Sequence, residues 1–222
     1  MRGPTSLRDA VHAAYAAIAE DDAAARAEPI ADGALEAVLA PGTRAVLAGD
    51  RSALLDLVGL LALRLGAEGP VVVVCGPERP ATLARSWLHA RARVARSARI
   101  TREGWQRLSA EVGRMAELDV SFSESLPDPE RTSELRGLLL LCDVAPAWID
   151  TTLTRAATVV VASSPFESPG WRLAWLEHTD ATACTLHVAA GGREAATEVY
   201  YERATGFFAR LEPDAPSSTE SP

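Results

Sequence analysis

The chain has 222 residues, 48% of them hydrophobic, and a formal net charge of −8 at pH 7. This length and apolar content suffice for one substantial core, and the acidic balance excludes indiscriminate binding to nucleic-acid phosphates. No segment approaches the roughly 18 consecutive apolar residues of a membrane helix, and the N-terminus lacks a signal-peptide pattern. We therefore expect a cytoplasmic protein without a membrane partner.

The N-terminal segment predicts a helical arm ahead of the main domain. Thr5 or Ser6 is a suitable N-cap for a helix that runs to Ala27. Apolar side chains recur at helical spacing, at Leu7, Val11, Tyr15 and Ile18. We expect residues 1–28 to form an amphipathic arm whose apolar stripe packs on its own domain, on a second copy or on another protein partner.

From Arg44 onward, apolar strand patterns alternate with helical patterns. The runs VVVVC and LLLLCD show no polar alternation, which is typical of strands buried on both faces of a parallel sheet. The predicted strands are Ala45–Ala48, Val71–Cys75, Val120–Ser123, Leu138–Asp143 and Thr158–Ala162. The predicted helices are Ala34–Leu39, Ser52–Leu65, Ala81–Ala98, Arg102–Leu118, Thr132–Arg136 and a segment from Pro146 to Arg155.

The C-terminal part has a different texture. We predict a helix that contains Trp171 and Trp175, followed by three antiparallel strands around the Gly191–Gly192 turn. These strands are Ala181–Ala189, Glu194–Tyr201 and Gly206–Leu211. The polar, proline-rich residues 213–222 predict a disordered tail. The fold class is therefore one α/β domain, residues 29–212, with a mainly parallel sheet and an antiparallel C-terminal edge.

The segment RAVLAGDRSALLD, Arg44 to Asp56, is the strand–turn–helix junction at which α/β proteins bind phosphate. A phosphate loop reads G-x-x-x-x-G-K-[ST], and its lysine reaches the β- and γ-phosphates. Here Gly49, Asp50, Arg51 and Ser52 fill a shorter loop, and the chain contains no lysine. The planar arginine fork replaces a compact ammonium poorly, and Asp50 adds a negative charge where a triphosphate would lie.

Other site chemistries find little support in the sequence. The three cysteines, Cys75, Cys142 and Cys184, lie in or at the end of apolar runs, which predicts small buried side chains. The four histidines, His12, His89, His178 and His187, show no ligand spacing, so we expect no metal site. No G-x-S-x-G or CxxC motif is present.

Seven arginines occur between Arg85 and Arg107. On a helical wheel, Arg85, Arg96 and Arg99 lie opposite the face of Trp87, and Arg93 flanks them. Such a stripe suits a nucleic-acid backbone or an acidic partner, and the alternative is a solvated helix face in an arginine-rich chain. No aromatic side chains interleave with these arginines for base stacking.

Several collinear phrases carry a resemblance to a known family. They are DGALEAVLAPGTRAVLAG, ITREGWQRLSAEVGRMAELDVSFSES, ELRGLLLLCDV and GFFARLEP, in this order along the chain. Together they resemble the C-terminal RecA-type motor domain of the DnaB replicative helicases over residues 30 to 213. The preceding helix stands in the place of that family's inter-subunit linker helix.

The resemblance implies a RecA-like fold and an ATP–Mg²⁺ site. Gly49, Arg51 and Ser52 stand at the phosphate loop. Glu78 stands where the family has the carboxylate that activates water, and Asp143 where it has the Walker B aspartate. The alternatives from the residues alone are a first-turn helix acid for Glu78 and a turn residue for Asp143.

Two more family positions are occupied only in part. Ser164 stands where the family has a polar sensor, with a simple loop serine as the alternative. Arg193 stands alone and one position displaced in the loop that carries the family's arginine finger. With the lysine and second glycine absent as well, the resemblance implies a chain without competent ATP hydrolysis and without a bound cofactor.

We therefore expect a binding or regulatory protein in DNA replication or another DNA transaction. One alternative is a weak helicase-type ATPase that binds ATP and Mg²⁺ through Arg51, Ser52, Glu78 and Asp143. The other is a DNA-binding module that uses the stripe Arg85, Arg93, Arg96 and Arg99.

Overall fold

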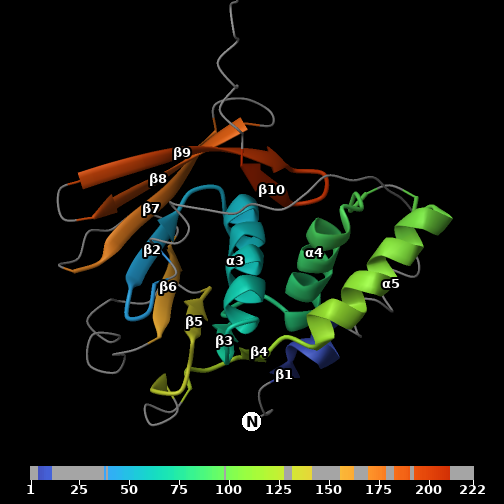
Figure 1. Ribbon diagram of the computed structural model, residues 1–222, viewed down its shortest axis with the longest axis horizontal. Coiled ribbons are helices and arrows are strands. Elements are labelled where there is room, and N and C mark those ends of the chain that lie inside the picture. Colours follow the sequence, from blue (N-terminus) through green and yellow to red (C-terminus); the bar gives the residue numbers. More distant parts are fainter. Residues whose placement is uncertain are drawn as a thin grey trace, which may run out of the picture.

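The computed structural model describes residues 5–11, 38, 40–97, 99–127, 132–141, 156–162, 170–178, 183–190 and 193–210. These residues form a sheet of ten strands, three longer helices and a helical turn at residues 7–11 (Figure 1). The helices are α3 (Arg51–Gly66), α4 (Pro80–Ala92) and α5 (Arg102–Ala116). The strands are β1 (Thr5–Ser6), β2 (Arg44–Ala48), β3 (Val71–Val74), β4 (Val120–Ser123), β5 (Gly137–Leu140), β6 (Ala157–Ala162), β7 (Arg172–His178), β8 (Ala183–Ala190), β9 (Arg193–Glu202) and β10 (Phe207–Arg210).

The strand order is β1-β4-β3-β5-β6-β2-β7-β8-β9-β10. The strands from β4 to β7 in this order pair in parallel, whereas β1 and the segment β8-β9-β10 pair antiparallel at the two edges. The expected parallel sheet with an antiparallel C-terminal edge is confirmed. Since β2 lies between β6 and β7, the turn that follows β2 lies at the centre of the parallel part.

The helices lie on one side of the sheet: α3 packs on the strands, α4 packs on α3, and α5 packs on α4. Figure 1 shows α3 beside the strands, with α4 and α5 successively farther from β2. Residues on almost every side of α3 are buried, which fits a helix enclosed between the sheet and α4. By contrast, α5 is amphipathic and buries Leu108 and Met115, while its outer face is charged. The larger hydrophobic core lies between the sheet and these helices, with Trp87 among its largest members.

A second, smaller core lies on the other face of the sheet, around Val46, Leu140 and Val160. Strands β2, β5 and β6 are therefore buried on both faces, as their uninterrupted apolar sequences predict. Within the described ranges, no helix is long and apolar enough to cross a membrane.

The prediction that the N-terminal arm is separate from the sheet is wrong at its start. Thr5 and Ser6 form β1 and pair with Phe122 and Ser121 of β4, and only then does the chain become helical. Leu7 and Val11 are fully buried in the main core, so this turn of helix packs on its own domain. The remainder of the predicted arm lies outside the described residues.

Two other predictions are also corrected. The helix predicted over Ala81–Ala98 ends at Ala92, because Arg93 adopts a left-handed backbone with φ of 53° and closes the helix. The helix predicted around Trp171 and Trp175 is instead strand β7, which buries Ala174 and Leu176 on one face. Burial of every second residue is the signal of a strand, whereas the two tryptophans four positions apart suggest a helix.

Several predicted segments cannot be compared in full. The helices predicted over 34–39 and 146–155 and the tail over 213–222 lie mostly or entirely outside the described residues. The same is true of Cys142 and Asp143, which follow β5.

Candidate functional site

The predicted phosphate loop is a two-residue turn between β2 and α3. Gly49 has φ of 143°, and a Cβ on it would lie 3.3 Å from the carbonyl oxygen of Leu176, so the turn is pressed against β7. Asp50 is the N-cap of α3: its Oδ1 accepts the backbone N–H of Ala53 at 2.9 Å, and its carbonyl accepts that of Leu54 at 2.9 Å. An anion at this helix end would compete with the chain's own carboxylate for the Ala53 N–H.

Arg51 and Glu78, predicted from separate segments, are brought together by the fold. The Nε of Arg51 lies 3.3 Å from Oε1 of Glu78, and a terminal nitrogen donates to the carbonyl of Leu141 at 3.1 Å. The side chains are 40% and 23% exposed. Arg51 thus links the start of α3 to the chain after β3 and after β5. Its charge is directed at a carboxylate of the same chain.

The other predicted site residues are placed only in part. Ser52 is exposed in the first turn of α3. Asp143 and Ser164 lie outside the described residues, and of Arg193 the structure describes the backbone, as the first residue of β9. The fold therefore brings Gly49, Arg51 and Glu78 together beyond the carboxyl ends of the parallel strands.

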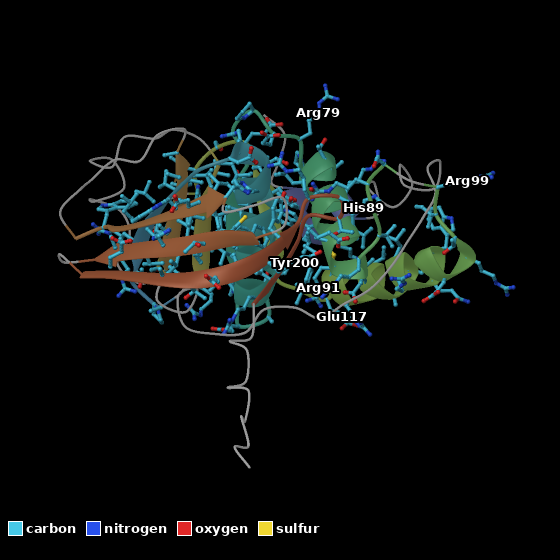
Figure 2. The ribbon with its side chains drawn as sticks, turned by 90° about the horizontal axis from the view of Figure 1, so that it is seen from above. Arg79, His89, Arg91, Arg99, Glu117 and Tyr200 are labelled. Carbon is cyan, nitrogen blue, oxygen red and sulfur yellow. The ribbon has the colours of Figure 1, made fainter. Side chains whose placement is uncertain are left out.

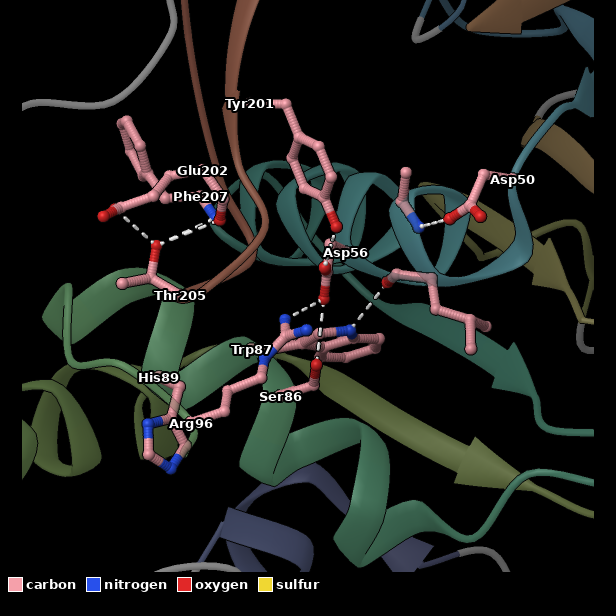
Figure 3. Close-up of polar contacts among 12 residues, drawn as sticks. Asp50, Asp56, Ser86, Trp87, His89, Arg96, Tyr201, Glu202, Thr205 and Phe207 are labelled. Carbon is pink, nitrogen blue, oxygen red and sulfur yellow. Dashed lines mark hydrogen bonds and ion pairs between the residues drawn. The ribbon is translucent and has the colours of Figure 1, made fainter. Parts of the chain in front are cut away.

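A buried polar cluster, which sequence reasoning missed, lies one turn further along α3. Asp56 is 3% exposed; its carboxylate accepts Ser86 Oγ at 2.9 Å and Tyr201 Oη at 2.9 Å, and it forms an ion pair with Arg96 (Figure 3). Burial raises the pKa of Asp56, and the Arg96 guanidinium opposes that shift. Burial also raises the pKa of Tyr201, reinforced by the neighbouring Asp56 charge.

This cluster joins α3, α4, the turn after α4 and β9. Gly206 belongs to it as well: a Cβ there would lie 1.7 Å from a terminal nitrogen of Arg96. The available sequence signal was one carboxylate, Asp56, in an otherwise apolar stretch of helix. Such a residue needs a buried partner.

The arginine stripe does not form one helix face. Since α4 ends at Ala92, the helical wheel does not extend to Arg93, Arg96 and Arg99. Arg93 is 5% exposed, with its guanidinium carbon 3.0 Å from the centre of the Phe207 ring, and Arg96 is paired with Asp56. Arg85 is half-buried on α4, whereas Arg99 points away from the molecule (Figure 2).

The two described cysteines are buried, as the sequence predicts. Cys75 and Cys184 are buried free thiols, and burial raises the pKa of Cys75 to about 12. Cys184 Sγ lies 3.1 Å from Nδ1 of His178 across the β7–β8 pair, a contact that the sequence did not indicate.

His187 lies on the exposed side of β8. It stacks on Trp175, with its ring nitrogens 3.1 Å from Glu177 and 2.9 Å from Glu194. In the described part of the chain, no group of three or more metal-ligating side chains converges.

Comparisons with known proteins place this geometry in a fold class. No protein-family model and no curated protein matches the chain in sequence. Among solved structures, it is similar to a DnaB-like replicative helicase described with its interactions with primase, at a TM-score of 0.59 and 8% identity over 78% of this chain. It is similar to a second structure, described as an ATPase domain, at a TM-score of 0.56 and 8% identity, over 77% of this chain and 85% of that one.

The chain spans 58% of the length of the DnaB-like helicase structure. At 8% identity, the likeness concerns the arrangement of helices and strands. The chain therefore has the RecA-like fold of DnaB-type helicase ATPase domains.

Proposed function

We propose that this protein is a binding or regulatory protein in DNA replication or another DNA transaction. Its RecA-like domain would serve as a binding scaffold and would not hydrolyse ATP. The observation that supports this most lies at the start of α3, where groups of the chain itself occupy the positions at which a phosphate would bind. Asp50 caps the helix, and Arg51 is held by Glu78 and the Leu141 carbonyl. The link to DNA transactions comes from the likeness to helicase ATPase domains.

Phosphate binding here would disrupt contacts that already exist. To reach a phosphate, Arg51 would leave Glu78 and the Leu141 carbonyl, and the carboxylates of Asp50 and Glu78 would face the incoming negative charge. Each repulsion at about 4 Å amounts to roughly 1 to 4 kcal/mol, from bulk water to a protein surface. No lysine is present to offset it.

The competing function is weak ATP hydrolysis. It is favoured by one observation: Arg51 and Glu78 meet at the carboxyl ends of the parallel strands, where open α/β sheets bind ligands. In that case Arg51 and Ser52 would contact phosphate, Glu78 would activate water, and Asp143 would hold Mg²⁺.

A phosphate-release assay on the full chain, with Mg²⁺ and with or without single-stranded DNA, separates the two functions. Our proposal predicts no turnover above the blank. Turnover that Glu78→Gln and Asp143→Asn abolish would instead establish the ATPase. Glu68→Gln is the matched control, because Glu68 pairs with Arg136 at 2.6 Å just ahead of β3, at the opposite end of that strand.

A further inference from the structure

A pocket away from the start of α3 has features of a ligand site. It has a volume of about 230 Å³ and lies between α3, α4, α5 and the start of β10. Leu60, Trp87 and Phe207 supply apolar and aromatic walls. Since a cavity of about 150 Å³ holds one benzene molecule, this volume suits a molecule of one or two rings.

Positive charge predominates around the pocket. Arg91, Arg93 and Arg114 line it, against the carboxylates of Glu111 and Asp56. Asp56 is already neutralised by a further guanidinium, Arg96. The walls therefore leave an excess of two positive charges in a chain whose net charge is −8.

The chain positions these groups at a conformational cost. Arg93 holds a left-handed backbone, with φ of 53°, at a helix end where glycine is the usual residue. Its guanidinium carbon lies over the Phe207 ring. Gly59 has a matching role, because a Cβ there would lie 2.2 Å from Trp87 and displace the indole that forms the wall.

The rim of the pocket is partly exposed to solvent, and its charged side chains form ion pairs with one another. Glu111, 9% exposed, accepts from Arg91 at 3.3 Å and also pairs with Arg114. The Arg91 and Arg114 side chains are 35% and 67% exposed, and Ala90 beside them is half-buried. At this rim two guanidinium groups share the single carboxylate of Glu111, unlike Arg51, which among the described residues has Glu78 to itself. A ligand carboxylate can therefore pair with the excess positive charge, and guanidinium groups are the donors best suited to it.

We propose that this pocket binds a small aromatic anion, a one- or two-ring molecule that carries a carboxylate. Its ring system lies against Trp87 and Phe207, and its carboxylate faces the guanidinium groups of Arg91 and Arg93. The site is separate from the start of α3, so it does not depend on whether ATP binds there.

Calorimetric titration of the full chain with 2-naphthoate tests this, with neutral 2-naphthamide as the matched probe. We expect 2-naphthoate to bind one per chain and at least about tenfold more tightly than the amide, as charge-assisted hydrogen bonds require. Ala90→Phe fills the pocket from its half-exposed wall, and Arg93→Met removes the buried charge. Each is expected to weaken binding at least about tenfold.

Arg102→Met, an exposed arginine at the start of α5, is the control and should bind like the original chain. Should Arg93→Met fail to fold, Ala90→Phe alone decides. Equal affinity for the two probes, unchanged affinity in Ala90→Phe, or no saturable binding of 2-naphthoate below about 1 mM would overturn the proposal.

Discussion

Removing Arg96 is the most informative perturbation of this fold, because it leaves the buried Asp56 carboxylate without its counter-charge. Asp56 is 3% exposed and the Arg96 side chain 26% exposed. Breaking a buried ion pair by removing one partner costs about 3 to 5 kcal/mol. Ser86 and Tyr201 still donate hydrogen bonds to the carboxylate, so we expect Arg96→Met to lie near the lower limit, at about 3 kcal/mol.

The loss of stability in Arg96→Met depends on pH, and the direction of that dependence follows from the pKa of Asp56. Burial raises the pKa of Asp56 above its ordinary value of 3.8, so the folded state holds the proton more tightly than the unfolded state. Stability therefore falls as pH rises through the window between the unfolded and folded pKa values. Without Arg96 the pKa rises further, so the penalty is largest near neutral pH and shrinks in acid, where the carboxyl is neutral.

Urea unfolding at about pH 7 and about pH 4.5 measures both effects. Arg96→Met should lower the midpoint by at least about 1 M at neutral pH, given slopes of about 1 to 3 kcal/mol per molar urea. Adding Asp56→Asn should recover part of the loss, and exposed Arg102→Met is the charge-matched control. A loss below about 1 kcal/mol, or additive effects of the two substitutions, would refute the reasoning.

Three further predictions concern packing and burial. Gly59→Ala should lower the free energy of unfolding by about 1 to 3 kcal/mol, because the new Cβ meets Trp87 at 2.2 Å. Gly113→Ala on α5, whose Cβ meets nothing within 4 Å, should raise it by about 0.5 to 1 kcal/mol. Thermal unfolding that shifts the two variants in the same direction would contradict this. Leu7→Ala should cost about 2 to 5 kcal/mol in urea unfolding, since Leu7 is fully buried, and a neutral result would mean that this turn is undocked in solution. Cys75, with its pKa raised to about 12 and no exposed surface, should resist iodoacetamide at about pH 9 until urea unfolds the chain. Labelling at Cys75 in the folded chain, identified by peptide mass spectrometry, would count against its burial.

The parallel core of the fold was predictable from the sequence because its signals are local. Uninterrupted apolar runs such as VVVV of β3 indicate strands covered on both faces, and their alternation with helical patterns indicates a parallel sheet. The start of α3 was also readable, since Asp50 is a strong N-cap ahead of an apolar helix.

The candidate site was predictable only where resemblance pointed to a position. Arg51 and Glu78 were both assigned to the ATP–Mg²⁺ site that the resemblance implies, but their mutual ion pair follows from geometry across 27 positions. The Asp56 cluster joins residues 30, 40 and 145 positions away, and no periodicity encodes such distances. The end of α4 was missed for a different reason: Arg93 carries no glycine or proline signal, and its left-handed backbone depends on tertiary packing.

Calorimetric titration of the full chain with ATP and Mg²⁺ is the direct test of whether the RecA-like domain works without nucleotide. Asp50 already caps the start of α3, and Glu78 already pairs with Arg51. We therefore predict no saturable heat up to about 1 mM nucleotide. A dissociation constant of a few micromolar, lost in Arg51→Met, would show that the site at the start of α3 still takes a triphosphate and would contradict the central claim.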